Sequence, residues 1–319
     1  MSNIKRREQW KQIEEALADK AAVELGWGAP ELQKWASRKF PKRFQGGDAE
    51  RVAFSRLVLR IAPPFLLRQI LAQPVKVYIG PRAHADRRDF YTSRDVESLA
   101  KLLELNAHSE VQGIPLDAAA LRYLPGVLEQ RSCTHICVGS ERSNVLTGLL
   151  LEKLFPQGPV PFSYCWPDGE GAGSRFTKTI DEIAGRMAPR DVRLLRDHRG
   201  YAFVLNGEPH FVALDNTQQD PAFDYGLVVA GQVTSEEDGL ADRRPYPVVA
   251  VMGASGTGTL GAAKWLAEGN LEAVIPSGGV LCAALKVKVT CQRSVGVNAD
   301  NREIEVTEFS KPMVWTKKS

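Results

Sequence analysis

The stretch PVVAVMGASGTGTLGAAK, residues 247–264, decides the fold that we expect for most of the chain. Apolar residues lead into a glycine-rich turn, and a run of small and apolar residues that suits a helix follows. This order of strand, glycine turn and helix is typical of α/β proteins. It also predicts a ligand site, because the start of a helix presents unpaired N–H groups and a partial positive charge that attract anions.

The turn itself supplies the first group of candidate residues. Glycines let a backbone approach a phosphate closely, and hydroxyl side chains add donors or cap the helix. The predicted ligand-binding residues of the turn are Gly253, Ser255, Gly256, Thr257, Gly258 and Thr259. The alternative is that the glycines serve only the close packing of a strand against a helix.

Two familiar nucleotide motifs match the turn only in part. Residues 256–261 fit the pattern G-x-G-x-x-G, but too few residues follow for the further βαβ units of a dinucleotide-binding domain. Thr259 stands where the Walker pattern requires Lys, which excludes an ordinary P-loop NTPase. Gly256, Gly258 and Thr259 are similar to the second glycine loop of the lysine-decarboxylase-like (SLOG) nucleotide binders. That pattern has a glutamate where this chain has Ala262, which implies binding without hydrolysis.

Upstream of the turn, residues 1–73 are predicted to form a small helical module. Trp10, Ile13 and Leu17 recur on one face of a helix, and no strand pattern precedes Pro74. A further short helix is expected at 65–71. A protein partner or self-association is the role that we expect for this module.

Residues 74–319 are predicted to form a Rossmann-like α/β domain with a mostly parallel sheet and an antiparallel C-terminal extension. Short β-rich runs alternate with helical patterns, and Asn206-Gly207 separates two runs as in a hairpin. The expected strands are 75–80, 134–139, 160–164, 201–205, 210–214, 225–230, 248–252, 281–290 and 303–309. The expected helices are 93–105, 116–130, 144–155 and 258–268.

Two other strand ends carry polar clusters that complete the candidate site. Arg82 follows the strand that ends at Gly80, and Ser140, Arg142 and Asn144 follow the next. Ligands bind beyond the carboxyl ends of parallel strands, and arginine suits phosphate or carboxylate groups. We therefore expect the three turns to face one crevice. The alternative for each cluster is a solvated loop, with Ser140 or Ser143 as a helix N-cap.

Acidic and cysteine-rich segments offer weaker candidates. Asp215 and Asp224 are weak catalytic candidates, as a general base or as partners of a ribose hydroxyl, but their surroundings are also typical of turns. The run Cys133-Thr-His135-Ile-Cys137 suggests a metal site. Three adjacent side chains on a strand cannot close a tetrahedron, so we expect buried thiols beside a core histidine and no metal.

Composition and charge limit the partners and the location. The chain has 41 basic and 38 acidic residues, a formal net charge of +3, which indicates no overall attraction to nucleic acid or membrane. The basic segment 34–43, which holds two aromatic residues, leaves nucleic acid as an unfavoured alternative partner. The charged N-terminus lacks the apolar core of a signal peptide, and no apolar run is long enough to span a membrane. The five cysteines are typical of reduced thiols rather than of a disulfide framework. We therefore expect a cytoplasmic protein.

The sequence therefore predicts a sensor or regulator that binds a nucleotide or another phosphate-bearing small molecule at the glycine-loop crevice, with no required cofactor. One alternative is an enzyme that acts on a nucleotide or sugar, with Asp215 or Asp224 as acid/base. A second alternative is a nucleic-acid-binding protein that uses the segment 34–43.

Overall fold

The computed structural model describes residues 3–23, 29–40, 53–54, 57, 65–67, 71, 74–80, 82–84, 87–90, 93–105, 109–113, 133–156, 159–167, 174–213, 222–234, 245–268, 274–275, 279–290, 303–308 and 313–316. Asp215, the helix expected at 116–130 and positions 41–43 of the basic segment lie outside the described residues.

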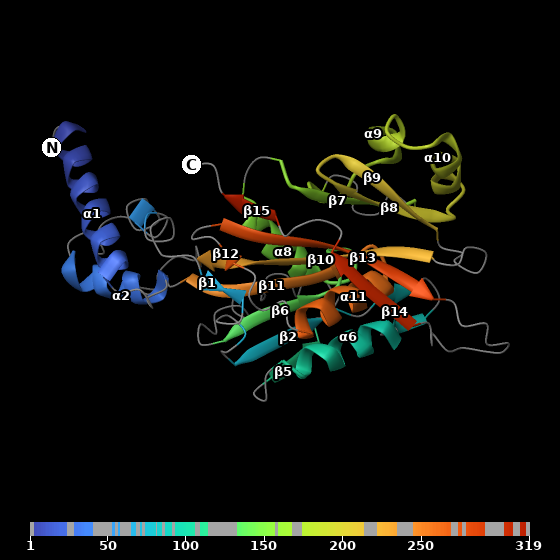
Figure 1. Cartoon of the computed structure of the whole chain (residues 1–319), viewed down its shortest axis with the longest axis horizontal. Helices are drawn as coiled ribbons and strands as arrows, with labels where there is room; N and C mark the ends of the chain where they lie inside the picture. The colour runs from blue at the N-terminus through green and yellow to red at the C-terminus, as the bar shows by residue number, and fades with distance from the viewer. Residues whose placement is uncertain are drawn as a thin grey trace.

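A mixed eight-stranded sheet forms the centre of the described fold (Figure 1). Its strands are β2 (Val75–Ile79), β5 (Ser109–Gly113), β6 (Thr134–Val138), β10 (Ala222–Thr234), β11 (Pro245–Gly253), β13 (Gly279–Thr290), β14 (Glu303–Glu308) and β15 (Met313–Thr316). The order across the sheet is β14-β13-β10-β11-β6-β2-β5, and β15 also pairs with β13. β5, β2, β6 and β11 are mutually parallel, whereas the pairings among β11, β10, β13, β14 and β15 are antiparallel.

The expected mostly parallel sheet is thus correct for only one half of the structure. The strands expected at 225–230 and 248–252 form a long antiparallel pair, with Val228 opposite Val251. Both strands are apolar on both faces, so their sequences indicate burial but carry no information on direction. The antiparallel strands expected after Val280 are confirmed.

Successive side chains along the strands point to opposite faces of the sheet, and each face has its own hydrophobic core. Tyr78 and Cys137 point to the face covered by α8 (Val145–Leu154). Val77 and Ile136 point to the opposite face, where α6 (Ser93–Leu103) and α11 (Gly256–Ala267) pack against each other. The helices predicted at 93–105, 144–155 and 258–268 are confirmed by these three elements. Helices on both faces bury the strands that carry the candidate turns.

A second, antiparallel sheet consists of β7 (Phe162–Cys165), β8 (Gly200–Leu205) and β9 (Glu208–Ala213). The strand predicted at 160–164 therefore does not join the parallel sheet, because its partner is the strand of the predicted hairpin. That hairpin is confirmed: Asn206 and Gly207 have φ angles of 51° and 85°, as a type I′ turn requires. The helices α9 (Ile180–Ala184) and α10 (Pro189–Arg196) cover the far face of this sheet (Figure 1).

The described N-terminal residues form two helices, α1 (Asn3–Val23) and α2 (Ala29–Lys39). Ile13 and Leu17, two members of the predicted apolar stripe, are buried in a small core of their own with α2. The division at residues 73 and 74 stays a prediction. None of the helices in the described ranges has the length and apolar character that crossing a membrane requires.

Short strands complete the fold. Phe65–Leu66 forms β1, which pairs with β12 (Val274–Ile275), so the helix expected at 65–71 is wrong at its first two residues. β3 (Arg82–His84) and β4 (Arg87–Phe90) form a small hairpin within the arginine-rich segment after β2. Two-residue and three-residue strands carry too little hydrophobic pattern to be recognised in a sequence.

Candidate functional site

The turns that follow β2, β6 and β11 lie side by side at one edge of the sheet. Ile79 pairs with Val138 and Val138 with Val251, so the three parallel strands end together. The N–H of Gly139 donates to the carbonyl oxygen of Val251 at 2.9 Å. A Cβ on Gly80 would lie only 2.1 Å from the carbonyl oxygen of Ser143. The three turns therefore share one edge of the sheet, and the expectation that they face one crevice stays a prediction.

Asn144 joins the β2 and β6 ends and starts α8. Its side-chain amide donates to the carbonyl oxygens of Tyr78 and Val138, both at 3.1 Å, and its side-chain oxygen accepts from the N–H of Leu146. The N-cap is therefore Asn144 rather than Ser140 or Ser143. Asn144 is only 1% exposed, so its hydrogen-bonding capacity serves the scaffold of the site.

Two further residues shape the β6 turn around this cap. Gly139 has a φ of 98°, in the region that strongly favours glycine. Its carbonyl oxygen accepts a 2.9 Å hydrogen bond from the Thr147 hydroxyl of α8. Ser140 is almost buried, and its carbonyl oxygen accepts from the N–H groups of Ser143 and Asn144. The turn is rigidly built, which suits a preorganised binding edge.

At the third turn, the chain supplies its own carboxylate to the start of α11. Ser255 is the N-cap, and its hydroxyl accepts from the N–H of Thr257 while donating to Asp224 of β10. Asp224 also accepts from the N–H of Gly258 at 2.8 Å and from the N–H of Tyr225 at 2.7 Å. Its carboxylate, 1% exposed, thus lies where the positive end of the helix favours an anion.

Asp224 belongs to a strand, so the interpretation of its segment as a turn is wrong for this residue. Its buried carboxylate accepts three hydrogen bonds from groups of its own chain, which compensate for the loss of contact with water. Such a group anchors a helix and orients Ser255, whose side chain is only partly buried at the mouth of the turn.

The glycines of the turn allow α11 to approach the sheet closely. A Cβ on Gly258 would lie 2.1 Å from the carbonyl oxygen of Tyr225, and one on Gly253 would lie 2.1 Å from the N of Thr259. Gly256, Thr257 and Thr259 are likewise buried. Close packing therefore explains part of the glycine pattern, whether or not a ligand binds.

Of the two candidate arginines, the structure describes the side chain of Arg142 but only the backbone of Arg82. Arg142 is exposed in the β6 turn, and its guanidinium lies 5.7 Å from the ring centroid of Trp166, the residue that follows β7. Arg82 is the first residue of β3, shortly after Gly80, and only its backbone is described. The edge therefore combines one exposed cation, a half-exposed hydroxyl and a buried carboxylate.

Glu141 ties the β6 turn to the second sheet, and the sequence alone did not single it out. Its carboxylate accepts 2.8 Å hydrogen bonds from the hydroxyls of Ser174 and Thr177. Burial raises the pKa of Glu141, although these two hydrogen bonds act in the opposite direction. Neither Glu141 nor the capping role of Asp224 follows from local pattern, because both depend on residues more than thirty positions away.

The cysteine–histidine run and the basic segment, the two other motifs of the sequence, make contacts within the fold. Cys133, His135 and Cys137 are buried, and His135 Nδ1 lies 2.8 Å from the hydroxyl of Tyr78, as expected for thiols beside a core histidine. Within the described residues, no group of such side chains is arranged to hold a metal ion. In the basic segment, the ammonium group of Lys39 lies over the ring of Trp35, and the ammonium group of Lys20 from α1 lies over the same ring.

Comparison of the chain with models of protein families, with curated proteins and with solved structures finds no match.

Proposed function

We propose that the chain binds a nucleotide or another phosphate-bearing small molecule at the edge formed by the turns after β2, β6 and β11, and acts as a sensor or regulator. The observation that carries the proposal is the contact between these turns, at Gly80 with Ser143 and at Gly139 with Val251. In the parallel half of the sheet the strands end together, and the carboxyl ends of parallel strands are the usual place for a ligand in α/β folds.

The charged groups of the edge determine where along it the phosphate of the ligand lies. The carboxylate of Asp224 already fills the positive end of α11, so a second anion at that point would meet repulsion. The phosphate instead lies toward the β6 turn, where Arg142 is exposed. Hydroxyl or N–H groups of the ligand lie toward the partly exposed hydroxyl of Ser255.

Binding fits the geometry better than catalysis. Both carboxylate oxygens of Asp224 are engaged by donors of its own chain, which leaves this residue poorly placed to move a proton. An enzyme that uses Asp224 or Asp215 as acid/base remains the second candidate for this edge. It predicts turnover that Asp224→Asn abolishes while ligand binding persists.

A thermal-shift screen against nucleotides, dinucleotides, cyclic nucleotides and sugar phosphates tests the proposal. A ligand present at 100 times its Kd adds about 2.7 kcal/mol of stability and raises the Tm visibly. Arg142→Gln should reduce that rise, whereas Lys153→Gln, at the opposite end of α8, should not. No rise with any compound, or an equal rise in Arg142→Gln, would contradict this placement of the phosphate.

A further inference from the structure

A cavity of about 300 Å³ opens beside the second sheet, between the segment after β7 and the helices α9 and α10. The lining residues that bear on its chemistry are Trp166, Lys178, Ile180, Asp181 and Arg196. Its size is at the lower end of the range for small-molecule pockets. None of these residues belongs to the proposed phosphate-binding edge.

One wall of the cavity is apolar and fixed in place. Trp166 is 5% exposed, and its ring stacks on Tyr164 with centroids 5.1 Å apart and an interplanar angle of 16°. Tyr164, a residue of β7 in the second sheet, is itself buried. Ile180 adds an aliphatic side chain at the start of α9. This wall suits the flat, apolar part of a small molecule.

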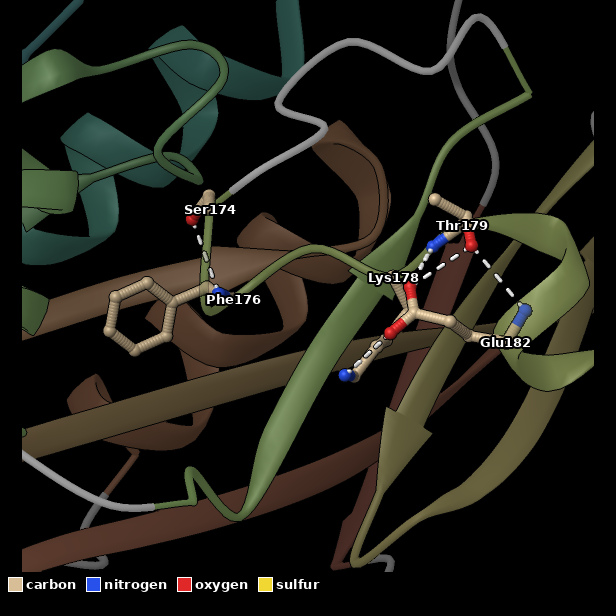
Figure 2. Close-up of polar contacts among 5 residues, drawn as sticks. All are labelled: Ser174, Phe176, Lys178, Thr179 and Glu182. Atoms are coloured by element: carbon tan, nitrogen blue, oxygen red, sulfur yellow. Dashed lines mark hydrogen bonds and ion pairs between the residues drawn. The ribbon is translucent and has the colours of Figure 1, made fainter.

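The polar side of the cavity presents two cations, Lys178 and Arg196, each paired with a carboxylate. Lys178 Nζ donates to Glu182 at 2.9 Å, and Arg196 donates to Asp181 at 3.1 Å (Figure 2 shows the first pair). An ammonium has three donors and a guanidinium five, so each cation keeps N–H groups beyond its ion pair. Both side chains are partly exposed, at 43% and 61%, and can reach a ligand at the mouth.

An ion pair on the surface places the Lys178 ammonium beside Glu182 in the absence of a ligand. Glu182 accepts from the N–H of Thr179 at 2.7 Å in a capping box, which fixes its carboxylate beside Lys178 (Figure 2). That backbone hydrogen bond, with the Lys178 contact, lowers the pKa of Glu182 to about 2, so this carboxylate is ionised at neutral pH. Preorganised donors reduce the ordering cost of binding.

We propose that this cavity binds a small molecule with one carboxylate or phosphate group and a flat apolar part. The oxyanion accepts hydrogen bonds from Lys178 and Arg196, and the apolar part packs against Trp166. The lining residues of this second site are separate from the proposed phosphate-binding edge, although the Arg142 guanidinium of that edge lies 5.7 Å from the ring centroid of Trp166. Asp181 limits the ligand to one oxyanion, since its carboxylate also faces the mouth.

NMR titration of the full chain tests the proposal, with the indole N–H signal of Trp166 assigned by Trp166→Phe. Benzoate and phenyl phosphate are the probes, and benzyl alcohol has the same ring without the anion. We expect saturable shifts with the two anions and none with the alcohol. The double variant Lys178→Gln, Arg196→Gln should weaken binding by roughly tenfold or more. Exposed ion pairs contribute little to folding, so this variant is expected to fold.

The matched control is Arg193→Gln, an exposed cation on α10 that does not line the cavity. It should bind both probes as the wild type does. No saturable shift with either anion, or an equal response to benzyl alcohol, would overturn the proposal. Unchanged affinity in the double variant would do the same. The probe that binds with the lower Kd, benzoate or phenyl phosphate, shows whether the site prefers a carboxylate or a phosphate.

Discussion

The carboxylate of Asp224 and the backbone N–H of Gly258 are joined by a 2.8 Å hydrogen bond across 34 positions of the sequence. The bond links strand β10, in the antiparallel half of the sheet, to the glycine turn that begins α11. It satisfies one of the orphan donors at a helix start with an anion of the same chain. The glycine turn is thereby both an anchor of α11 and one wall of the proposed site.

Removing this anchor should destabilise the protein. Asp224→Ala leaves the buried N–H of Gly258 without its acceptor, so we expect the free energy of unfolding to fall by about 1–3 kcal/mol. Asp224→Asn keeps an acceptor oxygen and should lose less. Urea unfolding of the two variants and the wild type measures the difference. Equal stability of the alanine variant and the wild type would show that the hydrogen bond has no structural role.

The glycine at position 258 should tolerate no side chain. A Cβ there meets the carbonyl oxygen of Tyr225 at 2.1 Å, so Gly258→Ala must move α11 away from β10 and should cost about 1–3 kcal/mol or more. Gly185→Ala is the control, because a Cβ at this position meets nothing within 4 Å and the φ is −65°. That control should be neutral or stabilise by about 0.4–1 kcal/mol. Thermal unfolding of both variants decides, and similar Tm values would refute the packing role.

Asn144 should be the most sensitive polar residue of the β6 turn. Asn144→Ala removes an N-cap, expected to cost about 1 kcal/mol, and leaves two buried strand-end carbonyl oxygens without this donor. Ser143→Ala, one position earlier, removes only a 3.2 Å bond to Ser140 and should change little. Chemical unfolding of the two variants tests this ranking. A larger loss of unfolding free energy in Ser143→Ala than in Asn144→Ala would contradict it.

Stability should depend on pH through Glu141. Burial raises its pKa above the ordinary value of 4.5. A carboxyl group whose pKa is higher in the folded state favours folding below the unfolded-state pKa, and this contribution is lost as pH rises through the folded-state pKa. Glu141→Gln has no such titration. The unfolding free energy of the wild type minus that of the variant should therefore fall as pH rises above the ordinary pKa of 4.5. A difference that rises with pH would contradict the effect of burial.

The sequence predicts those elements whose formation depends on residues a few positions apart. The helices at 93–105, 144–155 and 258–268 follow from amphipathic spacing or from a glycine turn, and Asn206-Gly207 determines its hairpin. Strand direction and partner choice depend on contacts between distant residues. The strand at 160–164 reads like the buried strands of the main sheet but pairs with β8 in another sheet.

The candidate site shows the same division. The glycines and polar residues after the parallel strands are visible in the sequence, and the structure brings those strand ends together. Asp224, by contrast, looked like part of a turn because Asp and Pro precede it, and its role appears only when β10 passes the start of α11. The cavity at Trp166 combines side chains from three separate elements, which no short motif reveals.

Hydrogen–deuterium exchange, measured with and without a ligand found in the thermal-shift screen, tests the central proposal most directly. We predict slower exchange at the amides of residues 139–144 and 253–259, because a ligand at the shared edge stabilises both turns. Protection confined to residues 174–196 would contradict the proposal, since it would place the ligand in the cavity beside Trp166 instead of at the edge of the parallel strands.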